Sequence, residues 1–298
     1  MVVYVDGKLV PKEEAKISVY DHGFLYGDGI FEGIRAYSGN IFRLQEHIER
    51  LYQSAKTIDL EIPLTAAELT QATLDTVAAN GMRDCYIRLV ISRGRGDLGI
   101  DPGNCEKATV VIIVDKIKLY PPEVYDHGIA LVTASIRRIP AQCLDPRIKS
   151  LNYLNNVLAK IEAKKAGVFE AVMLNHNGRV AECTADNIFA VKNGTVATPD
   201  LMEGALGGIT RQTVMELAPQ AGLQVKIQMM GMYDLYNADE CFLTGTGAEI
   251  VPVVSIDGRT VGSGKPGAVT LDLLRRYREV RVRDGVKVRY PQRAASAG

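Results

Sequence analysis

The chain has 298 residues, and its 35 Lys and Arg residues balance its 35 Asp and Glu residues. At roughly 150 residues per domain, this length favours two domains. A neutral chain gives no support for nucleic-acid binding or for attraction to a charged membrane. No apolar run reaches the ~18 residues of a membrane span, and the first residues lack the pattern of a signal peptide. We therefore expect a globular protein of the cytoplasm, with neither nucleic acid nor membrane as a partner.

The cysteines and histidines show no ligand pattern. The four histidines have no metal-ligand spacing, so no metal site is expected. The cysteines are scattered and form no C-x-x-C pair, which indicates reduced thiols and small buried residues. They are Cys85, Cys105, Cys143, Cys183 and Cys241.

Hydrophobic spacing and turn signals predict a first half that is rich in strands. The two longest helical patterns carry apolar residues on one face, and the second stops at Gly81. Strands are expected over residues 2–5, 9–10, 30–37, 41–42, 85–93 and 108–114, and helices over 44–57 and 66–80.

The pattern fails over residues 118–128. Two prolines follow Tyr120 there, and proline fits neither a helix interior nor a central strand. We expect an interdomain loop at this point. It separates a small N-terminal α/β domain, residues 1–117, from a large C-terminal domain, residues 129–298.

The second half alternates strands with helices, which favours a mixed sheet. Its last segment, residues 281–298, is expected to be a short strand or extension and then a frayed end. Strands are expected over residues 129–136, 170–174, 187–191, 225–228, 240–243 and 250–256, and helices over 152–166, 210–221 and 269–280.

A glycine pattern over residues 94–99 matches the dinucleotide-binding motif G-x-G-x-x-G. That motif requires a helix to open at its third glycine, so that the helix N-terminus holds the pyrophosphate. Here Asp101-Pro102-Gly103 follows, which is typical of a turn. We interpret residues 94–99 as a glycine-rich loop of the kind that can line a site.

Four later segments together carry chemistry. Lys149 comes directly before a predicted helix, and Glu182 is expected in a small polar turn. Gly207 and Gly208 precede another helix, whose first turn has open N–H groups that suit a phosphate. Residues 244–249 form a further turn of small residues. These groups are what pyridoxal 5′-phosphate (PLP) requires: a lysine to form a Schiff base, a carboxylate to pair with the pyridine nitrogen, and a binding site for the phosphate.

Seven motifs in chain order match one family. They are Tyr26–Gly33, Arg43–Leu51, Tyr86–Arg88, the Lys149 segment, the Glu182 segment, Gly208–Arg211 and Gly245–Glu249. With them, the chain resembles the branched-chain amino acid aminotransferases of the fold-type IV PLP enzymes from about Tyr4 to Tyr277. The resemblance implies an α/β (α+β) fold of two domains, like that of D-amino acid aminotransferase, with mixed sheets and flanking helices.

The resemblance also assigns the cofactor site. It implies that Lys149 forms the Schiff base with PLP and then moves the proton, and that Glu182 pairs with the pyridine nitrogen. The remaining cofactor residues it implies are Tyr153 beside the ring, and Arg50, Ile209, Thr210 and Thr246 around the phosphate.

A substrate pocket follows from the same resemblance. Leu98 and Ile100 belong to a loop that in this family reaches the neighbouring subunit's site, which implies a homo-oligomer, at least a dimer. The other substrate residues it implies are Tyr26, Phe31, Tyr86, Arg88 and Tyr120, with Gly247 and Ala248 in the turn that faces the substrate carboxylate.

The implied reaction is a reversible ping-pong transfer of the amino group of L-leucine, L-isoleucine or L-valine to 2-oxoglutarate. D-amino acid aminotransferases, R-selective amine aminotransferases and aminodeoxychorismate lyases share this fold type. The D-specific enzymes carry an Arg-x-His trap, where this chain has the apolar run Leu98–Ile100. An apolar loop suits a branched side chain. A D-amino acid or R-amine aminotransferase remains the alternative, and a non-catalytic protein with this fold is a third possibility.

Overall fold

The computed structural model describes residues 1–117 and 120–291. The chain divides into two compact units: Met1–Ile117 with Arg281–Gly298 is the first unit, and Lys118–Val280 is the second unit. Residues 118–119 of the expected interdomain loop, and residues 292–298 of the expected C-terminal domain, lie outside the described residues.

The first unit contains a seven-stranded sheet in which every neighbouring pair is antiparallel. The strand order is β16-β4-β3-β5-β6-β1-β2. Alternate residues of β5 and β6 are buried, as expected for strands with one apolar face. The strands are β1 (Val2–Val5), β2 (Lys8–Pro11), β3 (Gly29–Tyr37), β4 (Asn40–Phe42), β5 (Cys85–Ser92), β6 (Thr109–Asp115) and β16 (Gly285–Lys287).

Two long helices cover this sheet, with α2 against β3 and α3 against β1 and β6. The α3 helix starts with a capping box, in which the side chains of Thr65 and Glu68 each accept from the other's backbone N–H, and it ends at Gly81 in the left-handed region. The helices of this unit are α1 (His22–Tyr26), α2 (Leu44–Thr57) and α3 (Ala66–Asn80), with 3-10 turns at Lys12–Glu14 and Pro102–Asn104.

The second unit contains a nine-stranded mixed sheet. Its order is β12-β11-β10-β13-β14-β7-β8-β9, and β15 pairs with β14. Three pairs are parallel: β11 with β12, β14 with β7, and β7 with β8. The strands are β7 (Ile129–Thr133), β8 (Glu170–Leu174), β9 (Val180–Cys183), β10 (Asn187–Lys192), β11 (Thr195–Pro199), β12 (Gln224–Gln228), β13 (Glu240–Gly245), β14 (Glu249–Ile256) and β15 (Arg259–Thr260).

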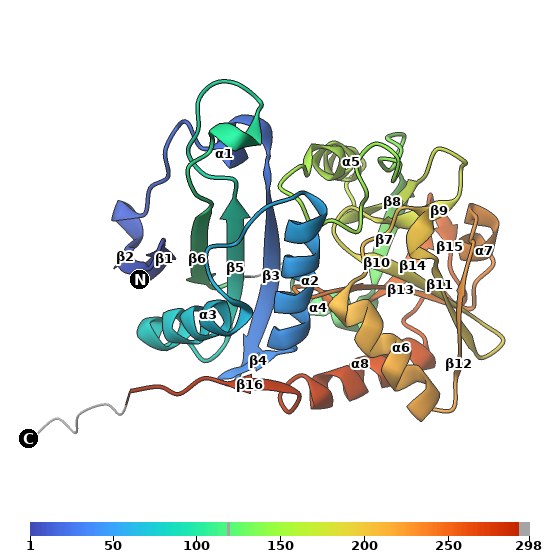
Figure 1. Ribbon diagram of the computed structural model, residues 1–298. Coiled ribbons are helices and arrows are strands. Elements are labelled where there is room, and N and C mark those ends of the chain that lie inside the picture. Colours follow the sequence, from blue (N-terminus) through green and yellow to red (C-terminus); the bar gives the residue numbers. More distant parts are fainter. Residues whose placement is uncertain (118–119, 292–298) are drawn as a thin grey trace, which may run out of the picture. The chain divides into compact units, whose positions relative to one another are not determined.

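Helices pack on this sheet at several strands (Figure 1): α5 lies on β8, α6 on β12 and β13, and α8 on β13 and β14. Small residues make the close approach of α5 possible, because Ala159 and Ala163 pack against Ala171 and Met173. The helices are α4 (Glu123–His127), α5 (Leu154–Lys165), α6 (Ile209–Gln220), α7 (Met232–Tyr236) and α8 (Ala268–Val280), with a 3-10 turn at Leu201–Glu203.

The C-terminal boundary differs from the expected one. Strand β16 pairs with β4 in the first unit, and Figure 1 shows the two side by side. The backbone N–H of Val288 donates to the carbonyl of Gly39 at 2.9 Å, and Asn40 Nδ2 donates to the carbonyl of Arg281 at 3.0 Å. The ladder therefore places the described residues from Arg281 onward in the first unit, and not in the expected C-terminal domain.

The expected environment of Glu182 was also wrong. It lies in β9, where all four residues are buried, and not in a turn. A strand that is buried on both faces shows no alternation of apolar and polar residues, so the sequence pattern hides it.

The cysteines are all free, as expected. Cys85, Cys183 and Cys241 are buried, whereas Cys105 is half-buried and Cys143 is exposed, so the expected burial is wrong for these two.

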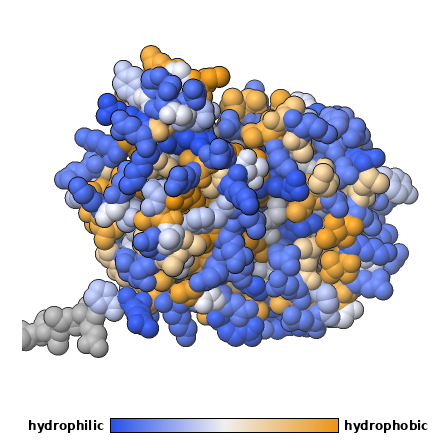
Figure 2. Space-filling model, viewed as in Figure 1, coloured by the Kyte–Doolittle hydropathy of each residue, from blue (hydrophilic) through white to orange (hydrophobic). Residues whose placement is uncertain are grey.

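Hydrophilic side chains cover most of the face that Figure 2 shows, with smaller apolar groups between them. Within residues 1–117 and 120–291, none of the helices has the length and apolar character needed to cross a membrane.

Candidate active site

Lys149 and Tyr153 lie together at the start of α5 in the second unit. Lys149 Nζ donates a hydrogen bond to Tyr153 Oη at 3.0 Å, and it lies 5.3 Å from the centre of the Tyr153 ring. Lys149 is half-buried, and the next residue, Ser150, is buried. The amine and the phenol are therefore neighbours.

Glu182 is nearly enclosed, with 5% of its surface exposed. Its Oε1 accepts from Arg138 Nε at 3.1 Å. Its Oε2 accepts from the backbone N–H of Leu206 at 2.9 Å and from Asn187 Nδ2 at 3.2 Å. Three donors therefore fix this carboxylate: Asn187 is five residues away, whereas Arg138 and Leu206 are 44 and 24 residues away.

Burial raises the pKa of Glu182, while the Arg138 guanidinium, the Leu206 amide and the nearby Lys149 each act in the opposite direction. A further positive partner, such as a protonated ring nitrogen, would favour the ionised carboxylate. Arg138 Nη1 donates to Asn155 Oδ1 at 3.2 Å and to Asn156 Oδ1 at 3.1 Å. Both asparagines belong to α5, so Arg138 connects Glu182 to the helix that follows Lys149.

Asn187 connects Glu182 to the N-terminus of α6. Its Nδ2 also donates to the carbonyl of Leu206 at 2.8 Å. A Cβ at Gly208 would lie 2.0 Å from Asn187 Oδ1, so any other residue there would displace the Asn187 amide. Gly208 is the N-cap of α6, and no side chain caps this end. The first-turn N–H groups of Ile209 and Thr210 are therefore suited to an anion.

The turn after β13 lies beside this helix end. Strands β10 and β13 pair Asn187 with Thr244. A Cβ at Gly245 would lie 1.9 Å from Asp186 Oδ1, so the turn approaches β10 closely. Thr246 and Gly247 are half-buried, and Ala248 is fully buried. Of the three residues expected to contact a ligand at this turn, Thr246 and Gly247 therefore have solvent-accessible surface, and Ala248 does not.

This arrangement fits the chemistry of PLP. It offers a lysine amine, a buried carboxylate, and a helix end open to a phosphate, and a network of hydrogen bonds joins the last two. Among the described residues, no group of three or more His, Cys, Asp or Glu side chains is placed to hold a metal ion.

Tyr120 is held by Asp186, a residue to which the sequence motifs assign no role. Tyr120 Oη donates to Asp186 Oδ2 at 3.2 Å, and the Tyr120 ring meets Phe169 edge-on with 5.6 Å between centroids. Burial, reinforced by the nearby Glu170 carboxylate, raises the pKa of Asp186 to about 7. Because Asp186 also contacts the Gly245 backbone, it anchors Tyr120 beside the turn that carries Thr246.

Arg50 lies in the first unit, on α2, where a fully buried Glu32 holds it. Its Nε and Nη2 donate to the two oxygens of Glu32, both at 2.7 Å, and His47 Nδ1 lies 2.7 Å from Glu32 Oε2. Burial alone would raise the pKa of Glu32, but Arg50 and His47 outweigh it and hold this pKa below its ordinary value. Glu32 and His47 lie inside two of the family motifs, but the motifs do not show that they are partners of Arg50.

Three of the expected substrate residues meet on one face of β3 and β5. Arg88 Nη2 donates to Tyr86 Oη at 3.1 Å, and its guanidinium carbon lies 4.5 Å from the centre of the Phe31 ring. Gly33 pairs with Arg88, and a Cβ there would lie 1.9 Å from Tyr86 Oη. The glycine thus leaves room for the tyrosine.

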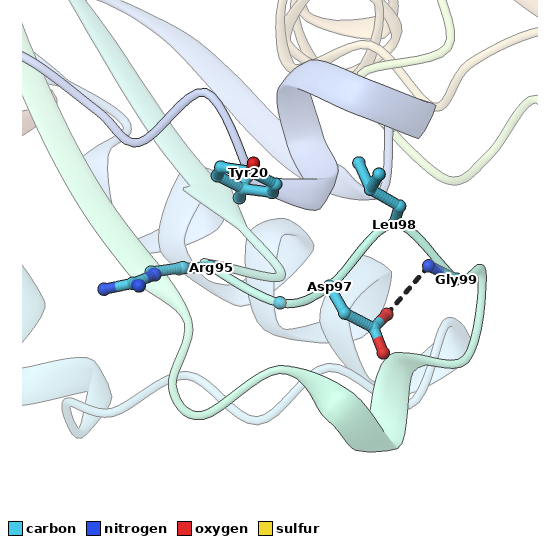
Figure 3. Close-up of a pocket in the computed structure, with 6 residues that line it drawn as sticks. Tyr20, Arg95, Asp97, Leu98 and Gly99 are labelled. Carbon is cyan, nitrogen blue, oxygen red and sulfur yellow. Dashed lines mark hydrogen bonds between the residues drawn. The ribbon is translucent and has the colours of Figure 1, made fainter.

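The other three expected residues of this unit form a separate, exposed group. Tyr26 Oη donates to the carbonyl of Leu98. Leu98 is 69% exposed and Ile100 is 81% exposed, which is unusual for large apolar side chains. They belong to a loop that borders an open surface pocket of about 500 Å³. Figure 3 shows the pocket, which is lined by Tyr20, Arg95, Gly96, Asp97, Leu98 and Gly99.

The comparisons with known proteins agree on one family. The family model of amino-transferase class IV matches residues 29–256. A protein of Methanocaldococcus jannaschii with a provisional branched-chain-amino-acid aminotransferase name is 50% identical over 97% of this chain and 99% of its own. The branched-chain-amino-acid aminotransferase of Escherichia coli K12 is 35% identical over 90% of this chain and 89% of its own.

Solved structures show the same fold. The branched-chain aminotransferase of Thermoproteus uzoniensis with norvaline has a TM-score of 0.89 and 38% identity, and the match covers 95% of each chain. The branched-chain amino acid aminotransferase of Thermobaculum terrenum in its PLP form has a TM-score of 0.87 and 36% identity over 94% of each chain. The expected two-domain fold is therefore confirmed. The chain belongs to the class IV aminotransferases, and the relatives described above are branched-chain amino acid aminotransferases.

Proposed function

We propose that this protein transfers the amino group of L-leucine, L-isoleucine or L-valine to 2-oxoglutarate, with PLP as its cofactor. The observation that carries the proposal is the Lys149 amine beside Tyr153, with the buried Glu182 joined to the open N-terminus of α6. The PLP form of the Thermobaculum terrenum enzyme supports the cofactor, and the norvaline-bound Thermoproteus uzoniensis enzyme supports an aliphatic amino acid as substrate.

Residues of the second unit hold the cofactor in this proposal. Lys149 would hold it covalently through Nζ, and Glu182 would pair with its ring nitrogen. The N–H groups of Ile209 and Thr210, with Thr246, bind its phosphate. When bound, PLP supplies an electron sink for the charge that develops at the substrate Cα.

Lys149 is also the acid and base. Its free amine would take the proton from the substrate Cα and deliver it to the carbon on the other side of the substrate nitrogen. The Tyr153 hydroxyl, 3.0 Å away, orients the amine during this movement. Gly247 and Ala248 direct backbone N–H groups at the substrate carboxylate.

Arg50, in the first unit, is a further proposed phosphate ligand. The two-pronged contact with Glu32 fixes the Arg50 guanidinium, and a planar, fixed guanidinium is well suited to a phosphate. Phe31, Tyr86, Arg88 and Tyr26 are each proposed to contact the substrate, and so is Tyr120. In an apolar pocket, one methylene more or less on the substrate changes the binding free energy by only about 1–3 kcal/mol. Several branched substrates are therefore expected to react.

A homodimer in the cytoplasm is part of the proposal. Val19 and Phe24, like Leu98 and Ile100, are large apolar residues more than two-thirds exposed. Such a group of exposed apolar residues is typical of a surface that another subunit covers. We propose that Leu98 and Ile100 reach the partner's substrate site. The free cysteines agree with a reducing compartment.

The test is the visible absorption spectrum of the purified, PLP-loaded protein, before and after L-leucine or D-alanine is added. We expect a yellow protein that bleaches with L-leucine only and regains its colour with 2-oxoglutarate. Lys149→Ala should bind PLP without the lysine-linked absorption band and lose turnover by several orders of magnitude. Bleaching with D-alanine only would move the function to the D-specific relatives, and wild-type turnover in Lys149→Ala would refute the assigned lysine.

A further inference from the structure

Thr244 in β13 has a hydroxyl that the protein does not satisfy. The residue is 1% exposed, and its Oγ1 has no hydrogen-bond partner among the described residues. Buried polar atoms nearly always have a partner. Thr198, fully buried in β11 of the same sheet, follows this rule, because its Oγ1 donates to the carbonyl of Ile188 at 2.9 Å.

The strand register shows which way the Thr244 side chain points. Thr244 pairs with Asn187 across the antiparallel β10 and β13, so their side chains share one face of the sheet. Asn187 on that face holds the Leu206 carbonyl and lies against Gly208. Helix α6 packs on β13. The Thr244 hydroxyl therefore faces the segment where α6 begins.

That helix end has no side-chain cap. An uncapped N-terminus attracts an anion, and a threonine hydroxyl supplies one O–H donor that an anionic oxygen can accept. The two observations are independent: one concerns the backbone of α6, and the other a side chain of β13. The N–H groups at the helix end and the Thr244 hydroxyl both lack a hydrogen-bond acceptor, which a phosphate would provide.

We propose that Thr244 is a further ligand of the cofactor phosphate, with Oγ1 donating to a phosphate oxygen directly or through one buried water. This inference rests on the proposed function, since the phosphate belongs to PLP. Thr246, in the turn that directly follows β13, is assigned to the same phosphate, so Thr244 lies two residues from a proposed phosphate ligand. Thr244 would thus be the buried side of the phosphate site.

The test separates the phosphate from the rest of the cofactor. Thr244→Val, Thr244→Ser and the control Thr198→Val are titrated with PLP and with pyridoxal, which has no phosphate, by absorbance. Thr244→Val should bind PLP about tenfold more weakly or worse, the loss expected of one hydrogen bond to a charged group. Its affinity for pyridoxal should stay within about twofold of wild type by the same reasoning. Thr244→Ser should bind both as wild type does, and Thr198→Val should show no loss specific to PLP.

A second readout covers the folded state. Without cofactor, Thr244→Val should unfold at the wild-type temperature or above, because a methyl group replaces an unsatisfied hydroxyl. The rise in unfolding temperature on adding PLP should be smaller than in wild type. The assignment would be overturned if Thr244→Val lost equal affinity for PLP and pyridoxal, or if its PLP affinity were undiminished. Either result would leave the proposed function intact. A wild-type protein that binds no PLP would overturn both.

Discussion

Arg138 shows how much the Glu182 carboxylate depends on a residue that no motif singles out. The two side chains are 6% and 7% exposed, with a shortest separation of 3.1 Å between guanidinium and carboxylate. Removing one partner of a buried ion pair leaves the other charge uncompensated, which typically costs about 3–5 kcal/mol. We expect Arg138→Met to lower the free energy of unfolding by that amount at pH 8.

The pH dependence of this loss identifies its cause. Burial already raises the pKa of Glu182, and removing Arg138 raises it further, so protonation at lower pH relieves the unpaired charge. The deficit of Arg138→Met should therefore be smaller at pH 5 than at pH 8, as measured by urea unfolding. Adding Glu182→Gln to Arg138→Met should recover most of the loss at pH 8. A deficit that is the same at both pH values would show that lost packing, and not charge, is responsible.

At this scale the sequence identifies residues by their motifs but not their partners. Lys149 and Glu182 are singled out because their chemical types and order match a cofactor site. Arg138 and Asp186 are missed, and so is the relation of Glu32 to Arg50. Each of these contacts joins residues 18 to 66 positions apart, and only the fold determines such pairs.

The pairing of β3 with β5 gives a prediction for two elements. A Cβ at Gly33 would lie 1.9 Å from Tyr86 Oη, so Gly33→Ala must displace the tyrosine and its hydrogen bond with Arg88. If Tyr86 and Arg88 contact the substrate as proposed, the KM for L-leucine should rise about tenfold or more, because misplacing a substrate-positioning group by ~1 Å can cost about 100-fold in rate. Steady-state kinetics with L-leucine and 2-oxoglutarate measures this change.

Tyr86→Phe provides the matched control for this prediction. It removes the atom nearest the new methyl group. The rise in KM of the double variant, as a free energy, should therefore be smaller than the sum for the two single variants. Strictly additive losses, or an unchanged KM in Gly33→Ala, would contradict the steric argument.

Long amphipathic elements were predictable, and short or fully buried ones were not. The helix expected over 66–80 is found with the same bounds, because a capping box and a C-terminal glycine mark its ends. Helices α1, α4 and α7 have five residues each, too few to show a periodicity. Strand β9 is buried throughout, so it shows no alternation either.

For the whole molecule, the segment after α8 stabilises the first unit. Tyr290 Oη donates to the carbonyl of Met82 at 2.8 Å, and the Arg281 guanidinium lies 4.4 Å from the centre of the buried Tyr37 ring. A chain ending at Val280 should lose these contacts and leave β4 as an unprotected edge. We expect the first unit to unfold several degrees lower, at about 4 °C per kcal/mol lost.

Hydrogen exchange shows where in the structure this stability is lost. Backbone amides of β3 and β4 should exchange faster in the chain ending at Val280, while those of β10 and β13 in the second unit should not change. A chain ending at Pro291 keeps every contact named above and is the control. Equal protection of β4 in both chains would refute the role given to β16. The sequence suggested a strand near this position but not its partner, because a three-residue strand carries no signal of the unit it joins.

The order of the units along the chain has a consequence for synthesis on the ribosome. The second unit, Lys118–Val280, is inserted between two parts of the first. An emerging chain can complete the second unit's sheet while the first unit still lacks β16. The part that is translated first is therefore finished last, only after residues 285–290 have left the exit tunnel. Any nascent chain that terminates earlier keeps an open sheet edge, which chaperones and proteases can recognise.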